Sequence, residues 1–359
     1  MMILEQMSEY GHERVAFHHD AETGLRAIIA LHSSVLGNAL GGTRRWFYHS
    51  EQEALHDVLR LSQGMTYKSA CAGLPMGGAK SVILLPKRGH AATEAEARAM
   101  GRFVETFSGV YIAAEDVGVS PQFIDWMARE TQHVMGGETV SRGGDPSPFT
   151  ARGVLRGMEA TLEVINNGNR GFDGVTVAIQ GLGSVGCYLA RLLVERGARV
   201  IGTDINREAL ERCVDELGIT AATPDTILTS DCDILAPCAL GGVINATLAP
   251  NLKCRAVCGG ANNILDDPDE DAVVLKHQGI VYAPDFVVNA GGVIELAGLY
   301  LNYSRERLDG MNEDIYNTTA RILADGATAA STYHAAIALA EQRIADGARR
   351  KQEHAHAAQ

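Results

Sequence analysis

Two lysines lie twelve residues apart in an otherwise apolar stretch, and their types and spacing suit chemistry on an anion. Lys68 and Lys80 stand within Met65–Lys80, and Gly77-Gly78-Ala79 leads into the second lysine. Long charged side chains are normally kept at the protein surface, where a lone lysine extends its ammonium group into solvent. Two lysines in such surroundings favour a pocket for an anion. Neighbouring positive charge and partial burial both favour a neutral lysine, which suits general acid–base catalysis near neutral pH.

Two adjacent carboxylates follow the apolar segment 111–114. Glu115 and Asp116 come shortly before a glycine, Gly118, that indicates a turn. An acid at a strand end is more often a turn or helix cap than a catalytic group. The spacing alone does not choose between Glu115 and Asp116.

A glycine-rich turn in the second half of the chain predicts a dinucleotide site. Gly181, Gly183 and Gly186 satisfy the whole G-x-G-x-x-G spacing directly after an apolar strand. The first glycine permits a tight turn, the second lets the backbone approach a pyrophosphate, and the third lets helix and strand pack closely. The following helix presents free N–H groups to the phosphate charge.

The next predicted strand ends at an acid, Asp204, which lies 18 residues after Gly186. A carboxylate there accepts both ribose hydroxyls and repels a 2′-phosphate, so the pattern favours NAD over NADP. Arg207 is close enough to serve a 2′-phosphate, although an exposed arginine at a helix start is the simpler interpretation. The competing hypothesis for the motif is a glycine-rich turn in an α/β sheet that binds nothing.

The elements around these residues predict an α/β protein of two domains. In residues 1–145 short strands and helices mix, and a polar Gly- and Pro-rich stretch at 136–148 has the composition of a hinge. Beyond it, strands and helices alternate, which implies a parallel sheet covered on both faces. From residue 293 the chain is mostly helical, and 352–359 reads as a frayed polar tail. Strands are predicted over 25–31, 81–85, 110–114, 175–180, 199–203, 234–236, 256–258 and 281–283, and helices over 51–64, 93–108, 150–166, 184–196 and 207–217.

Composition narrows the class of protein and of partner. The 359 residues are 46% hydrophobic, enough for two domains. Acidic residues outnumber basic ones 44 to 31, and the formal charge of −13 disfavours nucleic acid and anionic membranes as partners. No apolar run approaches the ~18 residues of a membrane span. Glu5 and Glu9 do not fit a secretory signal, so we expect a cytoplasmic protein.

The seven cysteines fit the same compartment. Their number is odd and they form no Cys-x-x-Cys pair. Cys254 and Cys258 are four residues apart, but they are only two potential ligands. A structural zinc site needs four ligands of this kind, so we expect no metal. Reduced and mostly buried thiols are the interpretation that suits a reducing environment.

Seven further motifs stand along the chain, at 37–44, 65–80, 114–118, 147–150, 238–241, 261–263 and 284–293. Together they resemble one known family, the glutamate/leucine/phenylalanine/valine dehydrogenases. The resemblance runs from about residue 10 to residue 345, with its motifs in the expected order, and is nearest to the leucine dehydrogenase branch. It implies a substrate and oligomerisation domain over 1–145, a Rossmann-like domain over 146–326, C-terminal helices at 327–359 that return to the first domain, and an active site in the cleft between the domains.

The family carries out reversible oxidative deamination of an L-amino acid to a 2-oxo acid and ammonia. The resemblance implies that Lys68 holds the substrate carboxylate, that Lys80 polarises water for attack on the imino carbon, and that Asp116 rather than Glu115 carries protons to and from the amino nitrogen. It also implies a homo-oligomer. Domain closure would then exclude water.

Further site residues follow from the same resemblance. The expected substrate contacts besides Lys68 are Leu40, Gly41, Met65, Ala114, Asn262, Val293 and Leu296. The expected cofactor contacts are Gly181, Gly183, Ser184, Val185, Gly186, Asp204, Thr150, Cys238, Ala239, Asn262 and Asn289, of which Thr150 and Asn262 would hold the nicotinamide end.

The resemblance also bears on the substrate side chain. Glutamate dehydrogenases carry a basic residue where this chain has Leu40, and a buried carboxylate without a partner costs several kcal/mol, so we expect an apolar L-amino acid. Ala79, Ala114 and Val293 resemble leucine dehydrogenases, whereas the segment 74–76 and Leu296 resemble phenylalanine dehydrogenases. Met135 departs from the threonine that leucine enzymes tend to have there, and either Met135 or Leu296 could equally be ordinary core.

Leucine, valine or isoleucine is therefore the expected substrate, with phenylalanine or tryptophan as the alternative. A catalytically silent NAD-binding sensor is a further hypothesis, but it predicts loss of at least one of Lys68, Lys80 and Asp116, and all three are present. A reductase of 2-oxo acids to hydroxy acids would usually offer a His base and an Arg clamp instead.

Overall fold

The computed structural model describes residues 3–140 and 145–357, with side chains up to Glu353. The chain forms two compact units. The first contains residues 1–144, 296–303 and 340–359, and the second contains 145–295 and 304–339. The second unit therefore extends beyond residue 326, and the segment 296–303 belongs to the first unit rather than to the Rossmann-like one.

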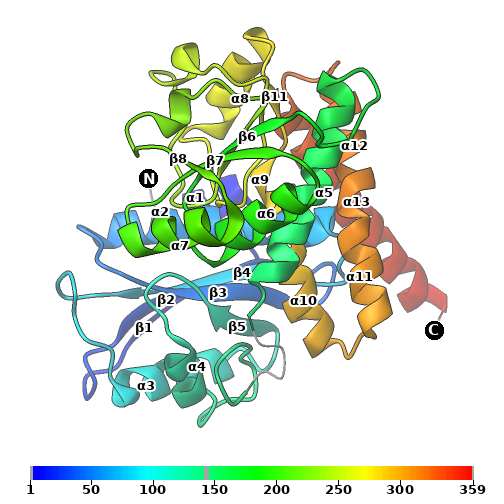
Figure 1. The fold of residues 1–359 in the computed structure, drawn as a ribbon. Helices are drawn as coiled ribbons and strands as arrows, with labels where there is room; N and C mark the ends of the chain where they lie inside the picture. Colours follow the sequence, from blue (N-terminus) through cyan, green and yellow to red (C-terminus); the bar gives the residue numbers. More distant parts are fainter. Residues whose placement is uncertain (1–2, 141–144, 358–359) are drawn as a thin grey trace. The chain divides into compact units, whose positions relative to one another are not determined.

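The first unit is built on a five-stranded sheet with the order β1-β2-β4-β3-β5 (Figure 1). β1 and β2 are antiparallel, β2 and β4 are antiparallel, and β3 runs parallel to both β4 and β5. Its elements are α1 (Ile3–Tyr10), β1 (Arg14–His19), β2 (Arg26–Ser33), β3 (Ala39–Trp46), α2 (Glu51–Cys71), β4 (Gly77–Leu84), α3 (Glu94–Glu105), β5 (Tyr111–Glu115) and α4 (Pro121–Met127).

Alternation along the strands divides this sheet into two packed faces. Ile28, Ala30 and Val82 pack with apolar residues of α2. Residues of the opposite parity, among them Ile29 and Ile83, pack with α3 and α4. Because successive side chains of a strand point to opposite faces, the parity of a residue fixes which helix layer it meets. Figure 1 shows α2 on one side of the sheet and α3 and α4 on the other.

The second unit has a six-stranded sheet in which every pairing is parallel, with the order β11-β10-β9-β6-β7-β8. This confirms the predicted Rossmann-like sheet. The strands are β6 (Thr176–Gln180), β7 (Arg199–Thr203), β8 (Thr220–Ala221), β9 (Ile234–Pro237), β10 (Ala256–Val257) and β11 (Val281–Tyr282). The helices are α5 (Ser147–Ile165), α6 (Ser184–Glu195), α7 (Arg207–Leu217), α8 (Pro268–His277), α9 (Asp285–Val288), α11 (Arg305–Glu313) and α12 (Ile315–Asp325), with 3-10 turns at Ile227–Thr229 and Ala249–Asn251.

Two C-terminal helices contribute residues to both units. α10 (Gly291–Tyr300) belongs to the second unit up to residue 295 and to the first unit from residue 296. α13 (Thr332–Ala357) belongs to the second unit up to residue 339 and to the first from residue 340. The predicted frayed tail from residue 352 is wrong as far as Ala357, because α13 continues that far. Part of the predicted hinge, 141–144, lies outside the described residues, and α5 takes in its end from Ser147.

Two elements of the first unit differ from the sequence-based expectation in ways that matter for the site. α2 extends to Cys71 rather than ending near residue 64, so Lys68 lies in its last turn. β3 was not predicted, because Gly41 and Gly42 lower the strand propensity of its centre. Both changes give the motif residues regular backbone positions.

Candidate active site

Strand parity places two charged residues, Lys80 and Arg44, on the α2 face of this sheet. Lys80 shares the parity of Val82, which packs with α2. On the neighbouring strand β3, Gly42 and Arg44 have the corresponding parity, and Arg44 Nη1 donates a hydrogen bond to Asp57 of α2 at 3.0 Å. The alternation of β3 and β4 therefore brings side chains that are 36 residues apart in the sequence onto one face.

The central contact of this face is an ion pair between the two groups predicted to be catalytic. Lys80 Nζ lies 2.9 Å from Asp116 Oδ2, with side-chain exposures of 8% and 17%. Gly42 makes the approach possible, because a Cβ on it would lie 2.8 Å from Asp116 Cβ and 3.2 Å from Lys80 Nζ. The glycine at this position clears space for the pair.

A second cation also reaches the carboxylate. Arg44 Nε donates to Asp116 Oδ2 at 3.0 Å. Burial by itself raises the pKa of Asp116, but the charges of Lys80 and Arg44 outweigh burial and hold that pKa well below its usual value. The carboxylate is therefore ionised in this arrangement.

The neighbouring acid has different partners. Glu115 is exposed, and its Oε1 accepts a hydrogen bond from Gly137 N at 2.7 Å. It therefore ties the end of β5 to the loop at residue 137, whereas Asp116 contacts the lysine. The geometry distinguishes the two carboxylates that spacing alone left equivalent.

The helix α2 carries the other predicted lysine. Met65 and Lys68 are one turn apart on α2, and both are partly buried. α2 lies directly on β4, because a Cβ on Gly78 would meet Thr66 N at 2.1 Å. Thr66 and Gly78 each come two residues before one of the lysines, so this close packing fixes the helix that carries Lys68 against the strand that carries Lys80.

Apolar residues predicted for the substrate side chain lie on the strands beside the ion pair. Leu40 is 1% exposed on β3, and its register partners are Gly78 of β4 and Ile112 of β5. No side chain fits at Gly41, because a Cβ there would lie 1.7 Å from Ala79 O. Ala114 of β5 is also buried.

The remaining two substrate candidates are on α10. Val293 is 8% exposed, whereas Leu296 is partly exposed. Val293 falls in the second compact unit and Leu296 in the first. Met135, whose role was open, is buried and donates its backbone N–H to Ala113 O at 2.7 Å.

In the second unit the glycine turn has the geometry that its spacing predicts. Gly181 follows β6 with φ +94°, a conformation that favours glycine. A Cβ on Gly186 would lie 1.9 Å from Gly181 O, so helix and strand pack closely there. Gly183 is the N-cap of α6 and provides no side-chain hydrogen bond, and its own Cβ position faces open space. Ser184 and Val185 form the first turn of α6.

The end of β9 lies beside the glycine turn that follows β6. β6 and β9 are neighbours, and strand order runs in opposite directions on their two sides, which is the switch point where α/β sheets bind ligands. Cys238 and Ala239 follow β9, and a Cβ on Gly181 would lie 2.7 Å from Ala239 Cβ. The predicted residues of the two loops are therefore in contact.

Asp204 closes the other side of the turn. Its Oδ2 accepts from Leu182 N and its Oδ1 from Asn206 N, both at 2.7 Å. It thus lies directly beside the glycine turn, at the carboxyl end of β7. Arg207 has a side chain 88% exposed at the start of α7 and is paired with Glu211 at 2.7 Å.

The other predicted cofactor residues form a hydrogen-bonded group. Asn289 Nδ2 donates to Asn262 Oδ1 at 2.9 Å and to Ala261 O at 3.2 Å. Among the described residues, the buried Oδ1 of Asn289 accepts no hydrogen bond. Thr150 lies on α5, with its Oγ1 2.7 Å from the position that a Cβ on Gly292 would take.

These features fit a dinucleotide. The N-terminus of α6 has no side-chain cap, so its N–H groups are available to a phosphate. The open space at Gly183 lets a pyrophosphate come close to the backbone, and the acid Asp204 follows the end of β7. A buried amide oxygen without a partner suits a ligand donor such as a carboxamide. All of these groups belong to the second unit.

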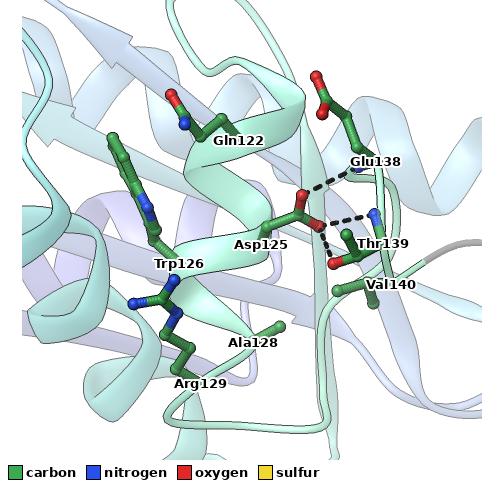
Figure 2. Close-up of a pocket in the computed structure, with 8 residues that line it drawn as sticks. All are labelled: Gln122, Asp125, Trp126, Ala128, Arg129, Glu138, Thr139 and Val140. Atoms are coloured by element: carbon green, nitrogen blue, oxygen red, sulfur yellow. Dashed lines mark hydrogen bonds between the residues drawn. The ribbon is translucent and has the colours of Figure 1, made fainter.

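A separate hollow lies along α4 (Figure 2). Asp125 accepts hydrogen bonds there from Glu138 N and from the backbone and hydroxyl of Thr139. None of its lining residues was predicted to bind substrate or cofactor. They are Gln122, Asp125, Trp126, Ala128, Arg129, Glu138, Thr139 and Val140.

Neither a metal cluster nor a membrane span occurs in the described part of the chain. No group of three or more His, Cys, Asp or Glu side chains among the described residues could hold a metal ion. No helix built from those residues is long and apolar enough to span a membrane. All seven cysteines are free thiols, and five are buried.

Sequence reasoning missed three residues that complete the site. Gly42 and Arg44 were noted only as parts of a motif, and Asp57, which holds Arg44, was not noted. Had residues 40–44 been recognised as a strand, its alternation would have placed Gly42 and Arg44 on one face. In the second unit, Gly260 was missed, although its N–H donates to Cys238 Sγ at 3.4 Å.

Two domains of one known family match this chain. Residues 12–133 match the dimerisation domain of the Glu/Leu/Phe/Val dehydrogenases, and residues 145–206 and 203–350 match the Glutamate/Leucine/Phenylalanine/Valine dehydrogenase domain. The leucine dehydrogenase of Bacillus cereus is 46% identical over 96% of this chain and 93% of its own length. The phenylalanine dehydrogenase of Bacillus thermotolerans is 40% identical over 95% and 90%.

A solved structure is similar over nearly the whole chain. The L-tryptophan dehydrogenase of Nostoc punctiforme has a TM-score of 0.85 and 38% identity, covering 97% of this chain and 100% of its own. The chain belongs to the glutamate/leucine/phenylalanine/valine dehydrogenase family. It is an amino acid dehydrogenase, an oxidoreductase of a family that uses a nicotinamide nucleotide, and the match to a dimerisation domain indicates a homo-oligomer.

Proposed function

We propose that this enzyme carries out the reversible, NAD-dependent oxidative deamination of a small apolar L-amino acid, leucine, valine or isoleucine, to its 2-oxo acid. The observation that carries the proposal is the Lys80–Asp116 ion pair at 2.9 Å, which joins β4 to the residue after β5. The strand between them, β3, carries the buried, apolar Leu40. The overall reaction takes the amino acid, NAD⁺ and water to the 2-oxo acid, ammonium, NADH and a proton.

In this proposal each side chain has one task. Lys68 binds the substrate carboxylate, Asp116 exchanges protons with the amino nitrogen, and Lys80 polarises the water that attacks the imino carbon. The bound nicotinamide accepts the hydride that leaves the substrate Cα. The ion pair keeps Asp116 ionised, so it can take a proton from a substrate ammonium group.

The second unit supplies the cofactor site. Gly181, Gly183 and Gly186 with the N-terminus of α6 would hold the pyrophosphate. Asp204 would bind the ribose hydroxyls and repel a 2′-phosphate, and the pairing of Arg207 with Glu211 supports NAD over NADP. Thr150, Asn262 and Asn289 would hold the nicotinamide end, with Ser184, Val185, Cys238 and Ala239 along the dinucleotide.

Leu40 is the main support for an apolar substrate. A glutamate side chain would place its distal carboxylate near this buried leucine without a partner, which costs several kcal/mol. Gly41, Met65, Ala114, Val293 and Leu296 would form the rest of the side-chain pocket. An apolar pocket discriminates one methylene by only ~1–3 kcal/mol, so we expect activity on several aliphatic amino acids.

An aromatic substrate is the second candidate, supported by the similarity to the tryptophan and phenylalanine dehydrogenases and by the partial exposure of Leu296. Initial rates of NADH formation at alkaline pH separate the candidates, with L-leucine, L-valine, L-isoleucine, L-phenylalanine, L-tryptophan and L-glutamate in parallel. A Lys80→Ala preparation is the blank for contaminating activity. We expect aliphatic amino acids to react and glutamate not to. Preference for an aromatic would keep the mechanism and change the substrate, and NAD binding without any activity would indicate a sensor.

A further inference from the structure

A guanidinium group shares the Asp116 carboxylate with Lys80. Arg44 Nε donates to Asp116 Oδ2 at 3.0 Å, the same oxygen that Lys80 Nζ reaches at 2.9 Å. The Arg44 side chain is 21% exposed. A carboxylate with two cations on one oxygen has little freedom to rotate, so its other oxygen keeps a fixed direction.

Arg44 is itself held in place by a hydrogen bond to a second carboxylate. Its Nη1 donates to Asp57 Oδ2 at 3.0 Å, and the hydroxyl of Tyr48 donates to that same oxygen at 2.8 Å. Asp57 lies on α2, three turns before Lys68. Burial opposes the charge of Arg44, but Asp116 and Asp57 together raise its pKa above the usual value. The guanidinium is thus a fixed positive charge between two carboxylates.

We propose that Arg44 is a positioning residue for the dehydrogenase reaction, which keeps the Asp116 carboxylate in place and ionised through a guanidinium that Asp57 and Tyr48 fix. This inference rests on the proposed role of Asp116. When Lys80 turns to its water during the reaction, Arg44 keeps its hold on Oδ2, and Oδ1 is left to exchange protons with the amino nitrogen.

A purely structural role for Arg44, joining β3 to α2, is the competing explanation. It predicts a loss of stability when the side chain is removed, with no change in turnover per folded enzyme. Positioning predicts a change in kcat and in the pH dependence, because an opposite charge within hydrogen-bonding distance favours the ionised carboxylate. These two readouts separate the explanations.

Among the described residues, several ionisable groups lie around Asp116 and its partners. They are Lys80, Asp57 and Tyr48 with Arg44, Tyr111 on β5, and the adjacent Glu115, which is bonded to Gly137 N. Burial raises the pKa of Tyr111 to about 12 and that of Tyr48 above its usual value. Neither tyrosine therefore titrates on the acidic side of the pH profile.

The test compares Arg44→Gln and Arg44→Lys with Arg60→Gln in the full-length enzyme. Arg60 is the matched control, because its Nη2 pairs with the other oxygen of Asp57, Oδ1, at 3.1 Å. The measurements are kcat and KM for L-leucine with saturating NAD⁺ across pH, the Kd for NADH, and the Tm.

We expect Arg44→Gln to lower kcat about 10- to 100-fold, as misplacement of a catalytic group does, with KM and the NADH Kd within about threefold of wild type. Losing the cation raises the pKa of Asp116, so the acidic limb of kcat should move to higher pH. Arg44→Lys should restore much of the limb's position but only part of kcat, because an ammonium lacks the guanidinium fork. Arg60→Gln should behave as wild type.

Arg44→Gln with the turnover and pH profile of Arg60→Gln would overturn the inference. If Arg44→Gln does not fold, Arg44→Lys decides, and wild-type kcat in that folded variant would overturn it equally. A wild-type enzyme inactive on every L-amino acid tested would instead contradict the proposed function. The two failures are therefore distinguishable.

Discussion

The candidate sites of the two units depend on different chemical groups, side chains in the first unit and backbone in the second. The first unit uses side-chain charge, since Asp116 is ionised between Lys80 and Arg44 on the α2 face of a mixed sheet. The second unit uses backbone, since the turn after β6 offers an uncapped helix N-terminus and a glycine, Gly183, with open space around its Cβ position. A charge cluster and a backbone cradle should therefore respond differently to substitution, the first in turnover and the second in cofactor affinity.

Removing the lysine should produce the largest effect. Lys80→Ala should lower kcat by roughly 10²–10⁴-fold, the usual contribution of a positioned acid or base, because Asp116 loses one of its two cationic partners and the attacking water loses its polarising group. Fluorescence titration should give an NADH Kd close to wild type, since the cofactor residues lie in the other unit. Normal turnover by this variant would refute the role of Lys80.

A pair of glycine substitutions sharpens the comparison. Gly42→Ala should lower kcat about 100-fold, because its methyl group would press on Asp116 Cβ and Lys80 Nζ and separate the pair. Gly183→Ala should keep the wild-type Tm, since no described atom beyond its own chain neighbours lies within 4 Å of its Cβ position. It should nevertheless weaken NADH roughly 10-fold by blocking the approach to pyrophosphate.

Steady-state kinetics and NADH titration of both glycine variants check this pair. Equal losses of cofactor affinity in the two variants would contradict the division of labour between the units. A lower Tm for Gly183→Ala would show that the glycine serves the fold rather than the ligand.

Asp204→Ala should have a smaller effect that is confined to the cofactor. It removes the acceptor for the ribose hydroxyls and the charge that repels a 2′-phosphate, so the Kd for NAD⁺ should rise about 10-fold and discrimination against NADP⁺ should relax. The measurement is kcat/KM for each cofactor with L-leucine. An unchanged cofactor preference would show that Asp204 does not read the ribose.

The smallest effect concerns stability and belongs to the first unit alone. Burial lowers the pKa of His12 to about 3 from its ordinary 6.5, with His32 adding to the shift, and His12 Nε2 bonds Ser62 Oγ at 2.7 Å. The unfolded chain binds a proton below pH 6.5 and the folded chain does not until about pH 3. Stability from this group is thus present above pH 6.5 and is lost as pH falls.

His12→Asn should therefore flatten the pH dependence of the unfolding free energy between those two values, by at most about 1.4 kcal/mol per pH unit. Urea unfolding at several pH values from 4 to 7 measures the slope, which does not depend on any uniform loss of stability. A variant slope equal to that of wild type would show that His12 is protonated in the folded enzyme.

The two units also differ in how far their sites could be predicted from sequence. The cofactor turn was predictable because its requirements are local, and the positive φ of Gly181 and the tight packing of Gly186 follow from glycine spacing within six residues. The all-parallel sheet was predictable from alternating strands and helices. The short strand β8 gave too little apolar sequence to be recognised.

The charge cluster was only partly predictable, because it depends on contacts between distant segments. The types and spacing of Lys68 and Lys80 indicated an anion site, but choosing Asp116 over Glu115 required either the family resemblance or the geometry of the strand end. Arg44 and Asp57 could not be paired from sequence, since their contact depends on the register of β3 and on the face of α2 that it meets. Gly41 and Gly42 make β3 suitable for the site, but they also lower its strand propensity, and for that reason the strand was not predicted from sequence.

The most direct test of the central claim follows the hydrogen on the substrate Cα. L-Leucine carrying deuterium at Cα is incubated with the enzyme and NAD⁺, and the products are analysed by mass spectrometry. The account predicts one deuterium in the NADH formed, together with equimolar 2-oxo acid and ammonium. Deuterium released into water, or 2-oxo acid formed without NADH, would contradict it.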